Sequence, residues 1–164
     1  MTPSRGQTSR MTALYIALVQ RLGHRRWVAA VGRRLVPFDC WLERTTGGRL
    51  SIAWPLPRLQ LTTIGRRTGA VHTTPLLYAR NGSDWIVTAS NWGQLHHPDW
   101  SANLIANPDA TIEVGGERID VGATLVSGAD REQLWDAVTG VWPAYETYGR
   151  RAGREIRVFR LSTR

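Results

Sequence analysis

The sequence of 164 residues contains no lysine, and all 21 of its basic residues are arginine. This absence excludes Schiff-base catalysis, a phosphate-binding loop that depends on lysine, and a serine nucleophile activated by lysine. Cysteine occurs once, at Cys40, so the chain cannot form an internal disulfide, which is typical of a reducing compartment. A single cysteine is more often a small buried apolar residue than a nucleophile.

Metal-binding patterns and membrane-spanning segments are also missing. The four histidines form no Cys/His/carboxylate cluster with zinc-ligand spacing, and the adjacent His96 and His97 would point in different directions on a strand or helix. No metal site is therefore predicted. The apolar run in residues 11–22 is too short to cross a bilayer, and Gln20-Arg21 stands where a signal peptide would need small residues.

Acidic residues are absent before Asp39, whereas seven arginines precede it. From residue 37 onward 14 arginines nearly balance 13 acids, so the net charge of +8 belongs almost entirely to the N-terminal segment. We therefore predict a basic helical arm (residues 1–36) and a near-neutral domain (residues 37–164). Two interpretations of the arm remain open: a helix on a membrane surface or over an anionic ligand, or a helix packed on its own domain.

The segment LTTIGRRTGAVHTTPLLYA (residues 61–79) reads as a strand, a tight basic loop and a returning strand, with alternating apolar residues on both sides. In residues 65–69 (GRRTG, called the GRRTG loop below) glycines flank two arginines and a threonine. Glycines permit close backbone approach, so N–H groups and arginine side chains can converge on one anion. An ordinary solvated hairpin loop with two exposed arginines is the alternative.

The remaining pattern predicts a mainly β fold with α-helices. Apolar content of 42% and eight tryptophans indicate a packed core. About six mostly antiparallel strands are expected, and a small barrel with flanking helices leaves no exposed strand edges. We expect strands near residues 59–64, 71–79, 85–89, 111–114, 118–125 and 156–161, and helices over residues 11–22, 37–42, 98–106, 129–141 and 145–151, with a connector at 51–57.

Two further stretches are candidates for a site. Residues 89–93 (ASNWG) end a strand in small and polar residues, and Ser90 there is expected to hydrogen-bond a planar ligand, since it lacks the context of a nucleophilic serine. Trp142, Tyr145 and Tyr148 are spaced by three and share one helical face. Such a row is commonly core packing, but buried phenols need partners, which favours a pocket wall.

Four segments together resemble the deazaflavin-dependent nitroreductase family: residues 37–49 (PFDCWLERTTGGR), 61–78, 89–114 and 141–159 (VWPAYETYGRRAGREIRVF). The resemblance covers the chain from about residue 37 to its end. It implies a split β-barrel that binds the deazaflavin coenzyme F420 and passes a hydride to a substrate. It also implies an actinobacterial protein, which an arginine-only composition fits.

The resemblance assigns roles to individual positions. It places the coenzyme on Gly65, Arg66, Arg67, Thr68, Gly69, His72, Thr73, Thr74, Pro75, Ser90, Asn91, Trp100 and Asn103. It places the catalytic pocket on Trp142, Tyr145 and Tyr148, with Ser90 as a further candidate. In the nitroimidazole-reducing member a lysine stands at the position of Asn91 and a tyrosine at that of Trp142. Coenzyme binding is therefore expected, whereas the substrate is open.

The hypothesis is an F420-dependent oxidoreductase that reduces a lipophilic acceptor, namely a quinone, a nitroaromatic or an activated alkene. Tyr145 or Tyr148 would donate a hydrogen bond to the negative charge that develops on the acceptor. An FMN-binding split-barrel reductase and a non-catalytic basic protein that binds membrane are the alternatives. Nucleic acid is not expected as a partner, because the strands carry too few aromatic residues among their arginines. A cytoplasmic protein is expected, peripheral at the inner face of the membrane if the arm binds lipid.

Overall fold

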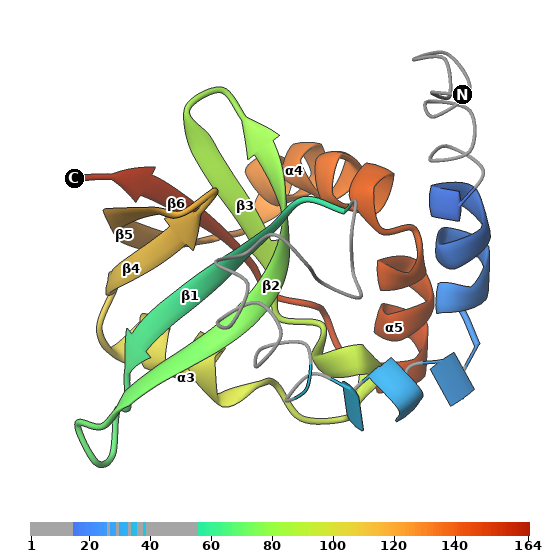
Figure 1. Ribbon diagram of the computed structural model, residues 1–164, viewed down its shortest axis with the longest axis horizontal. Helices are drawn as coiled ribbons and strands as arrows, with labels where there is room; N and C mark the ends of the chain where they lie inside the picture. Colours follow the sequence, from blue (N-terminus) through green and yellow to red (C-terminus); the bar gives the residue numbers. More distant parts are fainter. Residues whose placement is uncertain (1–14, 26, 29, 33, 36–37, 39–55) are drawn as a thin grey trace, which may run out of the picture.

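The computed structural model of the protein describes residues 15–25, 27–28, 30–32, 34–35, 38 and 56–164 (Figure 1). Six antiparallel strands close a barrel in the order β1-β2-β3-β6-β5-β4. The strands are β1 (Arg58–Ile64), β2 (Val71–Asn81), β3 (Asp84–Thr88), β4 (Asp109–Val114), β5 (Glu117–Val126) and β6 (Val158–Thr163). The predicted fold class is thereby confirmed.

Helices cover the barrel from outside. Helix α3 (Asp99–Ala106) packs against β1, α4 (Gly128–Val141) against β2 and β3, and α5 (Ala144–Ala152) against the single turn η1 (Asn91–Gly93) (Figure 1). The predicted helices at residues 98–106, 129–141 and 145–151 are confirmed. The helix predicted at 37–42, except residue 38, and all but the last two residues of the connector at 51–57 lie outside the described residues.

The barrel interior follows from the alternation along its strands. On β1, Leu59, Leu61 and Thr63 are buried while the residues between them are half-buried, because successive side chains of a strand point to opposite faces. Apolar side chains from all six strands and from α3 fill this interior: Leu59, Leu61, Leu76, Trp85, Val87, Trp100, Leu104, Ile112, Val121, Phe159 and Leu161. Burial of this set is the main source of stability for the barrel.

A second core lies between the outside of the barrel and helices α4 and α5. It contains Ile86, Leu134, Val138, Trp142, Ala144, Tyr145, Tyr148, Ile156 and Val158. Ile86 belongs to this core although its neighbour Val87 points into the barrel, which is the two-residue period of β3. The three aromatic residues singled out in the sequence are therefore members of the outer core.

The helical residues 15–23 lie beside α5 and complete this outer core (Figure 1). The Tyr148 hydroxyl donates to the Gly23 carbonyl over 3.1 Å, and Gln20 Nε2 donates to the Val141 carbonyl over 2.9 Å. Gly23 has to lack a side chain here, because a Cβ would lie 2.4 Å from Cζ2 of Trp142. This part of the N-terminal segment is thus packed on the barrel domain, while the division at residue 36 stays a prediction.

Candidate active site

The GRRTG loop joins β1 to β2 and is closed by its own backbone. The Gly65 N–H donates to the Ala70 carbonyl over 2.7 Å, and the Gly69 N–H donates to the Gly65 carbonyl over 2.8 Å. Gly69 has a φ of 70°, in the left-handed region that glycine tolerates best. The tight turn leaves Arg66 and Arg67 exposed to solvent, so their guanidinium groups are free of the core and able to meet an anion.

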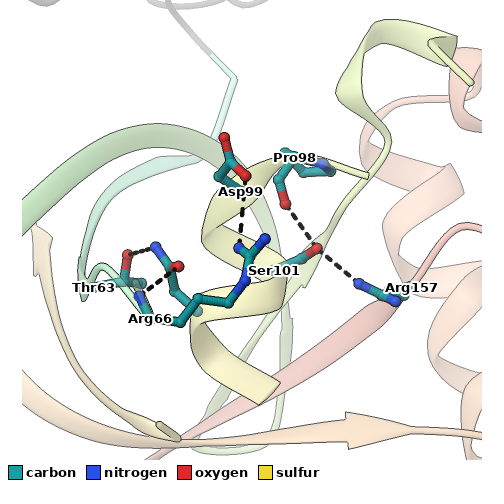
Figure 2. Close-up of polar contacts among 7 residues, drawn as sticks. Thr63, Arg66, Pro98, Asp99, Ser101 and Arg157 are labelled. Carbon is teal, nitrogen blue, oxygen red and sulfur yellow. Dashed lines mark hydrogen bonds and ion pairs between the residues drawn. The ribbon is translucent and has the colours of Figure 1, made fainter. Parts of the chain in front are cut away.

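Asn103 on α3 fixes the position of this loop. Its carbonyl oxygen accepts the Arg66 backbone N–H over 3.1 Å, and its amide donates to the Thr63 hydroxyl over 3.3 Å (Figure 2). Asn103 is only 4% exposed, and its bond to Thr63 is buried while its bond to Arg66 is partly buried. The predicted coenzyme residue Asn103 therefore acts here by orienting the loop.

An acidic side chain lies beside Arg66. Arg66 Nη1 lies 3.6 Å from Asp99 Oδ1 at the first residue of α3 (Figure 2). Asp99 is largely exposed, and an ion pair between exposed groups stabilises a protein by only about 0–1 kcal/mol. An anionic ligand can therefore displace Asp99 from the Arg66 guanidinium group with little loss of stability.

A pocket of about 510 Å³ opens between the GRRTG loop, the start of α3 and the segment before it. Its lining includes nine of the predicted coenzyme residues: Gly65, Arg66, Arg67, Thr68, His72, Thr74, Asn91, Trp100 and Asn103. Four lining residues were not predicted: His96, His97, Pro98 and Asp99. Their position just ahead of Trp100, at the start of α3 and in the loop before it, was the available signal. Within the described part of the chain, no group of histidine, cysteine or carboxylate side chains is arranged to hold a metal ion.

Four predicted coenzyme residues are not part of the pocket lining: Gly69, Thr73, Pro75 and Ser90. On β2 the register pairs Thr74 with Leu61 and His72 with Thr63, so both share the face of buried β1 residues. Thr73 and Pro75 lie on the opposite face, where the Thr73 hydroxyl meets that of Thr62 at 3.1 Å. Among the described residues, no group beyond its chain neighbours lies within 4 Å of the position that a Cβ on Gly69 would take, and Ser90 is the N-cap residue of η1 without a capping bond from its side chain. A contact of these four residues with the coenzyme stays a prediction.

The segment from Ala89 to His97, called the 89–97 loop below, forms one wall of the pocket and has an unusual backbone. Asn91 and Trp92 adopt φ values of 47° and 57°, which residues with a side chain rarely do. The Asn91 amide donates to the His96 carbonyl over 3.0 Å, so the loop is held across its two ends. Strained backbone of this kind persists only where surrounding contacts enforce it, and it is common at functional sites.

The aromatic row lies directly behind this loop. A Cβ on Gly93 would lie 3.1 Å from Cα of Tyr148, so the backbone of the loop touches α5. Tyr145 and Tyr148 meet edge to face, with ring centroids 6.3 Å apart. The row is absent from the lining of the pocket described above, and its place in the outer core agrees with the packing interpretation. Its proposed catalytic role stays a prediction.

Burial raises the pKa of both phenols of the row, Tyr145 and Tyr148, above the ordinary value. It raises the pKa of Tyr145 to about 12, with a smaller opposing effect from the Thr88 hydroxyl. Thr88 Oγ1 is buried and makes no hydrogen bond of normal geometry among the described residues. The hydroxyl groups of Thr88 and Tyr145 are therefore neighbours that are not hydrogen-bonded. Burial also raises the pKa of Tyr148, against the opposing effects of Trp142 and Arg151.

Known proteins of similar sequence and structure identify the family to which this chain belongs. The sequence model of the F420H(2)-dependent quinone reductase family matches residues 34–163. An F420H(2)-dependent quinone reductase of Mycobacterium tuberculosis is 37% identical over 145 residues, which are 85% of this chain and 97% of that protein. A protein of Mycobacterium bovis described as a putative F420H(2)-dependent quinone reductase has the same identity and coverage.

A solved structure of an F420-H2 dependent reductase superimposes with a TM-score of 0.60 at 29% sequence identity, over 65% of this chain and 94% of the other. The predicted resemblance to F420-dependent reductases is confirmed, and coenzyme F420 replaces the alternative FMN. This chain belongs to the F420H(2)-dependent quinone reductase family, and thereby to the oxidoreductases that use coenzyme F420.

Proposed function

We propose that this protein binds reduced F420 in the pocket beside the GRRTG loop and transfers its hydride to a quinone-type acceptor. The observation that carries the proposal is the convergence of Arg66, Arg67 and the start of α3 on one pocket of about 510 Å³. Nitroaromatics and activated alkenes accept a hydride by related chemistry and are secondary candidates. The family name and the relatives support quinones first.

The pocket residues fit an anionic, partly flat coenzyme. F420 carries a phosphate and a glutamate tail, for which two exposed guanidinium groups on a glycine turn are suitable partners. The buried Trp100 supplies an apolar surface beside them. When bound, F420 supplies the hydride, and this chain supplies orientation, charge compensation and exclusion of water.

For the acceptor we propose that Tyr145 donates a hydrogen bond to the oxygen on which negative charge develops. Its phenol stays protonated at neutral pH, and the neighbouring Thr88 precedes the 89–97 loop by one residue. The Tyr148 hydroxyl is already committed to the Gly23 carbonyl, so it is the less suitable donor. Because residues 15–23 cover the row, the acceptor would enter between them and the 89–97 loop.

A binding and turnover experiment tests this proposal. Titration of oxidised F420 with the protein should change coenzyme fluorescence saturably, whereas FMN should show weaker binding. Reduced F420 bound to the protein should then be oxidised by menadione far faster than free reduced F420 in stopped-flow absorbance. Absence of F420 binding would refute the proposed function. If the protein binds reduced F420 but no quinone oxidises it, the proposal would be reduced to coenzyme binding without catalysis.

We further propose that the N-terminal segment places the enzyme at an anionic membrane surface, where lipophilic quinones dissolve. Trp27, Val31 and Leu35 are spaced by four and are 58%, 45% and 38% exposed. Exposed arginines accompany them at positions 21, 25 and 34, and no acid precedes Asp39. An exposed apolar stripe beside basic residues favours binding in the plane of a membrane surface. None of the helices among the described residues is long and apolar enough to span a bilayer.

Replacing Trp27 and Val31 together with serine should reduce binding to anionic vesicles about ten-fold or more. Each exposed apolar side chain that enters a bilayer contributes roughly 1.5–3 kcal/mol, and about 1.4 kcal/mol is a factor of ten. Cosedimentation with phosphatidylglycerol/phosphatidylcholine vesicles measures the effect. A truncation is unsuitable, because residues 15–23 belong to the outer core.

Val71→Ser serves as the matched control, because Val71 is 66% exposed at the hairpin of β1 and β2. Its vesicle binding should equal that of the wild type. Equal binding of the wild type to anionic and neutral vesicles, or an unchanged double variant, would contradict the membrane proposal.

A further inference from the structure

Arg154, just after α5, ties the 89–97 loop together. Its guanidinium group donates to four carbonyl oxygens of that loop, at distances of 3.1–3.4 Å: Ala89, Ser90, Gln94 and His96. These carbonyls flank the strained residues Asn91 and Trp92. Arg154 thus enforces the unusual backbone of this pocket wall together with the bond from Asn91 to His96.

The same guanidinium group determines the protonation of His97. Nη1 of Arg154 lies 2.9 Å from Nδ1 of His97. Because a guanidinium group has only donors, Nδ1 must accept, and in the neutral ring the proton is therefore on Nε2. A doubly protonated imidazolium would place two N–H groups against each other at this contact.

The surroundings of His97 also oppose a positive charge on its ring. Burial lowers the pKa of His97, and Arg154 and Arg157 lower it further. Arg157 is held near by its bond to the Ser101 hydroxyl, 3.3 Å away (Figure 2). The other charged or titratable pocket residues are Arg66, Arg67, His72, His96 and Asp99. With two arginines close to it, His97 stays neutral over the physiological pH range.

We propose that His97 contacts the coenzyme: its neutral Nε2–H donates a hydrogen bond to an acceptor oxygen of bound F420, and Arg154 is the positioning residue that fixes this tautomer. The inference rests on the proposed function, since it assumes that F420 occupies the pocket that His97 lines. Arg66 and Arg67 supply charge, whereas His97 supplies a directional uncharged donor. The ligand oxygen belongs either to the deazaflavin and its sugar-like chain or to the phosphate and glutamate tail.

Two isosteric variants separate this role from a structural one. In His97→Asn the side-chain oxygen takes the place of Nδ1, so the Arg154 contact survives and the Nε2–H donor is lost. In His97→Gln the amide nitrogen takes the place of Nε2, so the donor survives. We expect the F420 dissociation constant, measured by fluorescence, to rise about ten-fold in His97→Asn with an unchanged melting temperature, and to stay near the wild-type value in His97→Gln.

The opposite order, with wild-type affinity in His97→Asn and weak binding in His97→Gln, would overturn the proposal in favour of a purely structural contact with Arg154. Repeating the titrations with a deazaflavin that lacks the phosphate and tail locates the acceptor oxygen. A loss with both ligands assigns it to the deazaflavin or its chain, and a loss with intact F420 alone assigns it to the phosphate or tail.

Nitrogen NMR of histidine-labelled protein without coenzyme supplies a readout independent of binding. We expect the His97 signals, identified as those that vanish in His97→Asn, to show an unprotonated Nδ1 and a protonated Nε2 at neutral pH. A protonated Nδ1 at this residue would overturn the assigned tautomer. Wild-type protein that fails to bind F420 would refute the proposed function itself, whereas wild-type binding retained in His97→Asn would refute only the His97 contact.

Discussion

Replacing both Arg66 and Arg67 with alanine should raise the dissociation constant of F420 about a hundred-fold or more. Both guanidinium groups line the pocket, and each charge-assisted hydrogen bond to an anion contributes roughly 1.5–3 kcal/mol. About 1.4 kcal/mol is a factor of ten, so each arginine accounts for ten-fold or more. Fluorescence titration of oxidised F420, repeated at rising salt concentration, measures the loss.

The fold should survive these substitutions, because both side chains are exposed and, within the described part of the chain, their one ion pair is that of Arg66 with the exposed Asp99. Arg118→Ala removes an exposed arginine from β5, outside the pocket lining, and should bind F420 as the wild type does. Hydride transfer at saturating coenzyme should change little in the double variant. Unaltered affinity together with depressed turnover would contradict the assignment of the two arginines to binding.

Tyr145→Phe should lower the rate of acceptor reduction about a hundred-fold while coenzyme affinity stays near normal. Loss of an oriented donor to a developing negative charge has an effect of this size. Ring volume is retained, so the outer core should pack as before. The measurement is stopped-flow oxidation of bound reduced F420 by menadione, with thermal melts of the same samples.

Tyr148→Phe is the matched control on the same helix. Its hydroxyl bonds the Gly23 carbonyl, so its removal should cost about 0.5–1.5 kcal/mol of unfolding free energy and loosen residues 15–23. The rate should change much less than in Tyr145→Phe. Full activity in both variants would show that the row is core packing alone and would leave Ser90 as the next candidate donor.

A pH titration of stability provides an independent check on Tyr145. Its pKa in the folded protein is raised to about 12 from the ordinary 10.0 by burial, so folding holds the phenol in its protonated form. The stability linked to this group is complete below pH 10 and is lost as the pH rises toward 12. The loss in this window should be smaller in Tyr145→Phe than in the wild type.

Local sequence patterns determined most of the fold. Alternation of Leu59, Leu61 and Thr63 marked the buried face of β1, and Gly115-Gly116 marked the hairpin of β4 and β5, because these signals arise from neighbouring residues. The four segments shared with F420-dependent reductases predicted the family and the coenzyme. The GRRTG loop was identifiable for the same reason: its glycines and arginines are contiguous.

Only the tertiary structure decided which predicted residues meet. Strand register places His72 and Thr74 on the pocket side and Thr73 and Pro75 on the other, and register depends on the partner strand. Arg154 reaches His97 across 57 positions of sequence, and residues 15–23 cover Tyr148 across more than a hundred. Contacts between segments so far apart leave no periodic trace in either segment. The sequence thus determined the barrel, the GRRTG loop and the family, whereas packing between distant segments determined the contact of Arg154 with His97 and the burial of the aromatic row.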